Sequence, residues 1–170
     1  MKPIRTILLT AFLTLFVFSV VVYTSCNKNK CDKVICLNLG ACDGGNCVCP
    51  TGFEGNRCQI LSRDKFIFTY NGGDSCTGKI TGKVFNKYPL YILAVLTDSV
   101  SMNMKNFLGN PQDSATCTIQ STDSFTFQGS NNSTTFSGTG KLSNDSLWMT
   151  YHVVHDTISY DCKYFGQSLR

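Results

Sequence analysis

The sequence predicts a mainly β protein in which a small disulfide-rich module is followed by an antiparallel meander that forms a β-barrel or a sandwich. Six cysteines lie within residues 31–58 with the spacing C-x4-C-x5-C-x4-C-x-C-x8-C, which indicates a short domain held by cross-links. After them, runs rich in Phe, Tyr, Thr, Val and Ile alternate with Gly, Asn, Asp and Ser, as strands alternate with turns. No helical period of useful length follows the N-terminal apolar segment.

The cysteine-rich segment needs its bridges because about thirty residues cannot bury enough apolar surface to fold alone. Each bridge typically contributes about 2–4 kcal/mol by restricting the unfolded chain. Cysteine spacing alone leaves the connectivity open. The alternative is a zinc site, but structural zinc ligands usually occur as two C-x2-4-C pairs, and thiolates do not persist in an exported protein.

The closing half of this segment, Cys47-Val-Cys49-Pro-Thr-Gly52-Phe53-Glu-Gly55-Asn-Arg-Cys58, has the pattern C-x-C-x2-G-aromatic-x-G-x2-C. Residues 31–58 therefore resemble an epidermal-growth-factor-like (EGF-like) domain. Calcium-binding members of that family place acidic residues before the first cysteine, whereas residues 27–30 are Asn-Lys-Asn-Lys, so we expect no metal or other cofactor. The resemblance implies a spacer or protein-contact role and three bridges, which are Cys31–Cys42, Cys36–Cys47 and Cys49–Cys58.

The start of the chain resembles a bacterial lipoprotein signal. Lys2 and Arg5 precede an apolar run at residues 7–22, and Tyr23-Thr24-Ser25-Cys26 follows, although the family usually has Leu where Tyr23 stands. The resemblance implies removal of residues 1–25 and lipidation of Cys26, and hence a lipid anchor in the cell envelope, at the outer membrane. An ordinary cleaved signal peptide and an uncleaved anchor are the alternatives, but the run is short for a spanning helix of about 20 residues.

Residues 26–30 would form a lipidated tether of at most about 18 Å, which places the module beside the membrane. Lys28, Lys30 and Lys33 either favour anionic head groups or only solvate the tether. The residues after Cys26 lack the acidic run associated with surface export, so the surface and periplasmic faces both stay open. Loss of the signal leaves 13 of the 15 basic residues against 11 acidic ones, and no basic cluster suggests a nucleic-acid partner.

Residues 59–63 are expected to be a linker, and residues 64–170 an all-β domain long enough for a core of its own. The expected strands are residues 64–70, 76–86, 90–97, 100–107, 115–121, 124–129, 133–141, 146–154 and 158–165. The expected turns include Asn71-Gly72-Gly73, Thr97-Asp98-Ser99, Gly109-Asn110-Pro111, Thr122-Asp123-Ser124, Ser130-Asn131-Asn132 and Ser143-Asn144-Asp145.

Alternation along these strands predicts which side chains are buried. Within residues 146–154, one face has Leu147, Met149, Tyr151 and Val153, and the other has Trp148, Thr150, His152 and Val154. Further pairs expected to share a face are Phe125 with Phe127, Phe66 with Phe68, and Met102 with Met104.

This domain resembles the β-rich domain that follows an EGF-like module in Bacteroidetes-type lipoproteins, a family with no assigned activity to transfer. The residues that show the resemblance are Asp74-Ser-Cys76, Val100-x-Met-x-x-Lys-Asn106-Phe107, Phe136-Ser-Gly138-Thr-Gly140 and Tyr160-Asp-Cys162-Lys-Tyr164. Among its three cysteines we expect a Cys76–Cys162 bridge, because closing a meander brings the first and last strands together. Cys117 is then a small buried apolar residue, and a bridge through Cys117 is the alternative.

Catalysis is not expected. His152 and His155 are the only histidines, and at a spacing of three on a strand they point to opposite faces. No nucleophile elbow, metalloprotease motif or phosphate-binding loop occurs. Four segments resemble the Asp-Ser/Thr-aliphatic acceptor for O-glycosylation in Bacteroidetes, although Asp-Ser is also ordinary turn chemistry. Their acceptor residues are Ser99, Ser114, Ser146 and Thr157.

Two functions follow from different classes. In the first, the protein is a non-enzymatic, lipid-anchored envelope protein whose EGF-like module is a membrane-proximal spacer or protein-interaction unit and whose β-domain binds or presents a partner, protein or glycan. In the second, the β-domain is a lipocalin-like carrier of a small apolar ligand, with Trp148, other aromatic residues and methionines lining it. A filled interior would favour the first, and an apolar cavity of about 300 Å³ or more the second. A third function, as an enzyme accessory or a polysaccharide-binding surface, would need an exposed row of aromatic residues.

Overall fold

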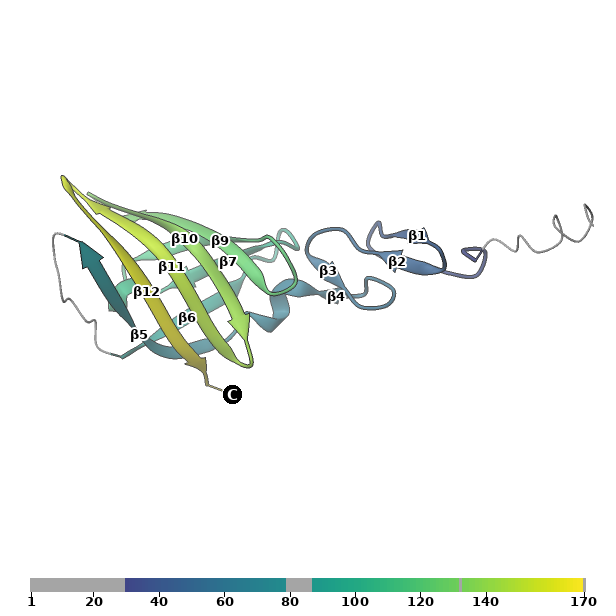
Figure 1. The fold of residues 1–170 in the computed structure, drawn as a ribbon, viewed down its shortest axis with the longest axis horizontal. Coiled ribbons are helices and arrows are strands. Elements are labelled where there is room, and N and C mark those ends of the chain that lie inside the picture. The colour runs from purple at the N-terminus through teal and green to yellow at the C-terminus, as the bar shows by residue number, and fades with distance from the viewer. Residues whose placement is uncertain (1–29, 79–86, 132, 170) are drawn as a thin grey trace, which may run out of the picture.

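The computed structural model describes residues 30–78, 87–131 and 133–169, which form a small cysteine-rich module and an eight-stranded closed barrel (Figure 1). The expected signal and Cys26 lie outside the described residues. Within the described residues, no helix has the length and apolar character needed to cross a membrane. The mainly β fold is confirmed, and of the two predicted forms of the meander the barrel is the one observed.

The module is built from two short hairpins and three disulfides. β1 (Ala41–Asp43) pairs with β2 (Asn46–Val48), and β3 (Phe53–Glu54) pairs with β4 (Ile60–Leu61). The bridges are Cys31–Cys42, Cys36–Cys47 and Cys49–Cys58, which is the pairing implied by the EGF-like resemblance. Exposed apolar side chains are common in the module, so cross-links rather than a core hold it. They include Ile35, Leu37, Leu39, Val48 and Ile60.

The barrel is an up-and-down meander in which each strand pairs with the next and the last pairs with the first. Two short 3₁₀ helices accompany it, η1 (Ser62–Lys65) before the first strand and η2 (Phe107–Gly109) after the third. The strands are β5 (Thr69–Gly78), β6 (Tyr88–Ala94), β7 (Ser101–Lys105), β8 (Ser114–Ile119), β9 (Ser124–Asn131), β10 (Thr134–Ser143), β11 (Ser146–His155) and β12 (Ile158–Ser168).

Three expectations for residues 59–78 are wrong. Residues 59–63 are not a free linker, because they contain β4 and the start of η1. The expected strand at 64–70 is mostly η1 and the segment after it, and β5 begins at Thr69. The expected turn at residues 71–73 lies inside β5, where a Cβ on Gly72 would collide with the backbone of Phe165 and the ring of Tyr164. Close packing inside the barrel, not a turn, therefore requires this glycine.

Most later turn signals fall between strands, but of the expected turn at residues 130–132, Ser130 and Asn131 lie in β9 and residue 132 is outside the described residues. Asn144 and Asp145 join β10 to β11 with φ values of 46° and 63°, as a two-residue hairpin with left-handed central residues requires. Of the expected strand at 76–86, residues 79–86 lie outside the described residues. The other seven expected strands differ from the observed ones by a few residues at their ends.

The interior of the barrel is filled with side chains. On β11 the face with Leu147, Met149, Tyr151 and Val153 is the buried one. Phe125 with Phe127 and Met102 with Met104 are also buried, as alternation indicates. Phe66, which follows η1, and Phe107, the first residue of η2, extend this core. The Phe66 ring lies 5.4 Å from that of Phe125, and the Phe107 ring lies 4.6 Å from that of Phe136. Aromatic rings from outside the strands thus add to the core.

We expect Leu147→Ala, on the inner face of β11, to lower the free energy of unfolding by about 3 kcal/mol, because it leaves a cavity in this filled core. The matched control is Leu93→Ala on β6, since Leu93 is 43% exposed on the outer face. Urea unfolding at one pH measures both. Equal effects of the two substitutions would contradict the assigned inner and outer faces.

Candidate functional site

An exposed aromatic pair lies on the outer wall of the barrel. Leu147 and Met149 point inward, so Trp148 between them points outward, and it stands directly opposite Phe165 in the β11–β12 register. The two ring centroids are 4.4 Å apart. Trp148 is 54% exposed and Phe165 is 40% exposed, so solvent reaches both rings. Large apolar side chains gathered on an otherwise polar wall are a reason to look for a partner.

A groove of about 830 Å³ surrounds this pair and crosses the wall from β9 to β5. Such a hollow is expected because the twist of the strands gives a barrel a hyperboloid shape, which is concave along the strands. Lys141 stands opposite Trp148, and Lys163 stands opposite Thr150. Polar neighbours line the rest of the groove, and they include Asn71, Ser75, Lys87, Ser124, Thr139 and Gln167.

A buried carboxylate lies behind the floor of the groove. Asp74 of β5 is 2% exposed and accepts hydrogen bonds of 2.6 Å from the hydroxyls of Tyr88 and Tyr151. Burial raises the pKa of Asp74, and the two hydroxyl hydrogen bonds oppose that rise. Burial and the nearby carboxylate likewise raise the pKa of both tyrosines. The cluster joins β5 to β6 and β11 through the interior, which is a structural role.

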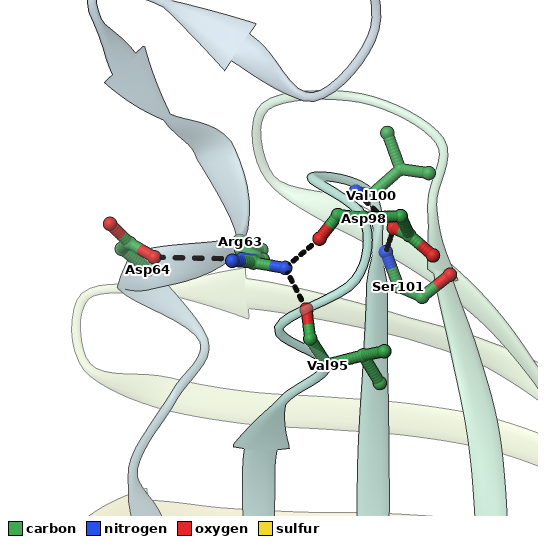
Figure 2. A network of polar contacts seen from close by, with 6 residues as sticks. All are labelled: Arg63, Asp64, Val95, Asp98, Val100 and Ser101. Carbon is green, nitrogen blue, oxygen red and sulfur yellow. Dashed lines mark hydrogen bonds and ion pairs between the residues drawn. The ribbon is translucent and has the colours of Figure 1, made fainter.

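The module is fixed to the barrel by Arg63, as Figure 2 shows. This side chain of η1 is 8% exposed, and its guanidinium donates to the backbone carbonyls of Val95 and Asp98 in the loop after β6. The Asp98 carboxylate in turn accepts from the amides of Val100 and Ser101. A hydrogen bond from the Ser101 side chain, followed by those from the Ser101 and Val100 amides, lowers the pKa of Asp98.

Further contacts cross the same junction. The Ser62 amide donates to the carbonyl of Gly52 in the module at 2.9 Å, and Lys65 pairs with Glu54 at 2.8 Å. Gly52 has a φ of 94° and packs against Val100, so a side chain there would collide with the barrel loop. The module, η1 and the loop at residues 95–100 therefore form one packed joint.

The cysteines of the barrel lie in its interior. Cys76 and Cys162 stand opposite each other in the β5–β12 register and form a disulfide. Cys117 is a free thiol on the inner face of β8, and burial raises its pKa to about 12. A thiol with so high a pKa forms little thiolate, so Cys117 is suited to packing rather than to reaction.

The two histidines do not form a shared site. His152 Nδ1 lies 2.8 Å from Asp161 on the outer wall, whereas His155 Nδ1 lies 2.6 Å from the Thr134 hydroxyl at the end of β11. Within the described parts of the chain, His, Cys, Asp and Glu side chains form no group of three that could hold a metal ion.

The four candidate glycosylation segments lie at loops and strand ends. Ser114 and Thr157 are exposed, and Ser99 and Ser146 are half-buried. The preceding aspartates have local structural roles: Asp98 caps two amides, Asp113 accepts from Asn131, and Asp145 and Asp156 have positive φ. Turn chemistry accounts for each aspartate and leaves glycosylation as a prediction.

Sequence reasoning separated the Trp148 face of β11 from the Leu147 face without deciding which one is outside, and it missed Asp74 and Arg63. A signal for Asp74 was present, because it precedes Cys76 by two residues and a strand puts both on one face. Nothing local to Arg63 indicates that its partners are carbonyls more than thirty residues away.

Comparisons with known proteins add one structure. No family model matches the chain, and no curated protein matches it. Among solved structures, the chain is similar to a crystal structure titled a "putative outer membrane protein" from Bacteroides fragilis NCTC 9343, at 13% sequence identity and a TM-score of 0.43. The alignment covers 63% of this chain and 52% of that one, so the chain spans about half the length of its structural neighbour.

We expect Tyr151→Phe to make stability fall more steeply as pH rises. The folded pKa of Asp74 is above its ordinary value of 3.8, so its contribution is most favourable below that pH and is lost as pH rises through the folded pKa. Removing a hydroxyl that stabilises the ionised form raises the folded pKa further, which costs roughly 1–2 kcal/mol at neutral pH. Urea unfolding between pH 3 and 8 measures the free energy of unfolding of the wild type and of Tyr151→Phe. Asp74→Asn removes the titrating carboxyl and should give the flattest pH profile, and Asp43→Asn, at an exposed position, is the control. Parallel profiles for all four proteins would contradict it.

We expect Arg63→Ala to loosen the junction, because two charge-assisted hydrogen bonds to the loop are lost, at a cost of about 2–3 kcal/mol. Hydrogen exchange of residues 95–101 should accelerate, and proteases should cut that loop. Arg57→Ala is the control, since Arg57 bonds only within the module, to the Ile35 carbonyl. Unchanged exchange in the Arg63 variant would show that the loop does not depend on it.

Proposed function

We propose that the protein is a non-enzymatic cell-envelope binding protein, anchored by lipid at Cys26, with an EGF-like module as a membrane-proximal spacer and the barrel as the binding unit. The packed joint at Arg63 is the observation that supports it most directly. A spacer can set the position of the barrel only if the two parts are joined firmly. Here β4 continues directly into η1, and Arg63 of η1 donates hydrogen bonds to the barrel loop after β6.

The filled interior of the barrel favours a partner that binds to its outer surface over a ligand carried inside it. The space that a lipocalin-like carrier would leave for its ligand is occupied by buried methionines and rings, including those of Phe66 and Phe107. The buried Asp74 has two hydroxyl donors and is not accessible to a substrate. Recognition would therefore use the wall or the loops.

The polarity of the wall supports a lipid as the membrane attachment. Outward positions of β8, β9 and β10 are rich in hydroxyl and amide side chains, whereas a membrane-spanning barrel presents an apolar band to lipid. These positions include Thr116, Thr118, Thr126, Gln128, Ser137 and Thr139. A barrel of this kind suits an aqueous face of the envelope.

Counting thiols tests the anchor. The chain has 10 cysteines and eight of them form disulfides, which leaves Cys26 and Cys117. Folded protein isolated from its native envelope should not react with maleimide, because Cys117 is buried and lipid occupies the Cys26 sulfur. After unfolding without reductant, maleimide should label Cys117 alone. Labelling of Cys26 in the unfolded protein would overturn the lipid anchor, and intact mass identifies the modification.

A further inference from the structure

We propose that the groove around Trp148 and Phe165 binds an acidic polysaccharide, with the two rings stacking on sugar rings and Lys87, Lys141 and Lys163 pairing with the acid groups. The proposal rests on the proposed function of the barrel as a binding unit and names the class of its ligand. Three features of the groove carry it: the aromatic platform, the sign of the charge, and the polar rim.

The aromatic platform consists of the Trp148 and Phe165 rings, which are inclined to each other by 46° and both expose ring surface to a sugar. The faces of aromatic rings carry partial negative charge, which attracts the polarised C–H groups on the apolar face of a pyranose. In the neighbouring strand β5, the residue opposite Phe165 is Gly73, so no side chain of β5 lies directly beside the Phe165 ring. The platform is thus open in the direction across the strands, along which a chain of sugars could extend.

The charge of the groove is positive. Lys87, Lys141 and Lys163 are exposed and line it. Asp74 is the one carboxylate among the lining residues, and it is buried behind the floor with two tyrosine hydroxyls bonded to it. Lys141 lies 3.3 Å from Asp123, but an exposed pair of this kind contributes little and can exchange for a ligand anion. Clustered positive charge attracts an anionic ligand.

The polar rim favours sugar over peptide. The floor is the face of a paired sheet, so it offers no free strand edge to which a peptide backbone could add. It offers instead hydroxyl and amide side chains that can exchange hydrogen bonds with sugar hydroxyls. These are Ser75, Ser124, Thr139, Thr150, Asn71 and Gln167.

A membrane surface rich in anionic lipid would use similar residue types, since tryptophan and lysine both favour the interface. The shape of the site argues for the polysaccharide, because a chain can enter a concave groove of about 830 Å³ that a planar bilayer would span. The membrane is therefore the competing outcome of the test.

The test uses the fluorescence of Trp148, the single tryptophan of the chain. Full-length protein in vesicles of zwitterionic lipid, which add no tryptophan, is titrated with polygalacturonate, with dextran sulfate, with neutral dextran and with vesicles containing anionic lipid. We expect a saturable change of emission with at least one of the two acidic polymers, weakening as salt rises, and a much weaker response to dextran.

Variants identify the groove. Phe165→Ala and the double variant Lys141→Ala/Lys163→Ala should each weaken binding at least about tenfold. The matched control is Tyr91→Ala/Lys105→Ala, because this aromatic and this lysine stand opposite each other on the β6–β7 wall, away from the groove. Near-ultraviolet circular dichroism and thermal unfolding show that each variant is folded before its affinity is compared.

Three results would overturn the proposal: emission that stays constant with both acidic polymers, binding that the groove variants leave unchanged, or a response to anionic vesicles alone. None of these bears on the thiol count, which tests the anchor separately. Conversely, an unlipidated Cys26 would leave polysaccharide binding in the groove as a measurable property of the barrel.

Discussion

Pairing of β12 with β5 is the constraint on which the rest of the structure depends. This contact joins residues about ninety positions apart, closes the sheet of eight strands into a barrel, and places Cys76 opposite Cys162. The disulfide between them closes a long loop, with a sequence separation of 86, and long loops gain most from a cross-link in the chain-entropy account. Once the sheet is closed, each strand has one face in the core and one in water, so the alternation of the sequence becomes an inside and an outside.

The interior and the wall have complementary tasks. Inside, rings and methionines fill the space, and the buried carboxylate of Asp74 has hydroxyl donors on β6 and β11 that compensate part of its burial. Outside, hydroxyl and amide side chains cover β8, β9 and β10, whereas Trp148 of β11 and Phe165 of β12 form an exposed aromatic pair. Their exposure gives nothing to the core, and we infer that it is retained for recognition.

The cysteine-rich module is held together by disulfides, whereas the barrel is held by its packed interior. It has almost no core, and its disulfides replace one. At its end the chain enters the barrel without a flexible linker, since Arg63 bonds the carbonyls of a loop that also packs against Gly52. A stapled spacer joined rigidly to a filled barrel would hold the groove at a set distance from a lipid anchor, which links the proposed function to the proposed ligand.

The sequence by itself determined the local features: the stapled module, most strand positions, the hairpin at residues 144–145, and which side chains share a face of β11. Each of these depends on the spacing of neighbouring residues, through the two-residue period of a strand or the backbone preferences of turns. Only the tertiary structure decided that the meander closes as a barrel, that Gly72 lies inside a strand, that Asp74 meets two tyrosines, and that the groove crosses five strands. These depend on register between distant segments, and nothing within a single segment encodes which residues its partner strand will place opposite it.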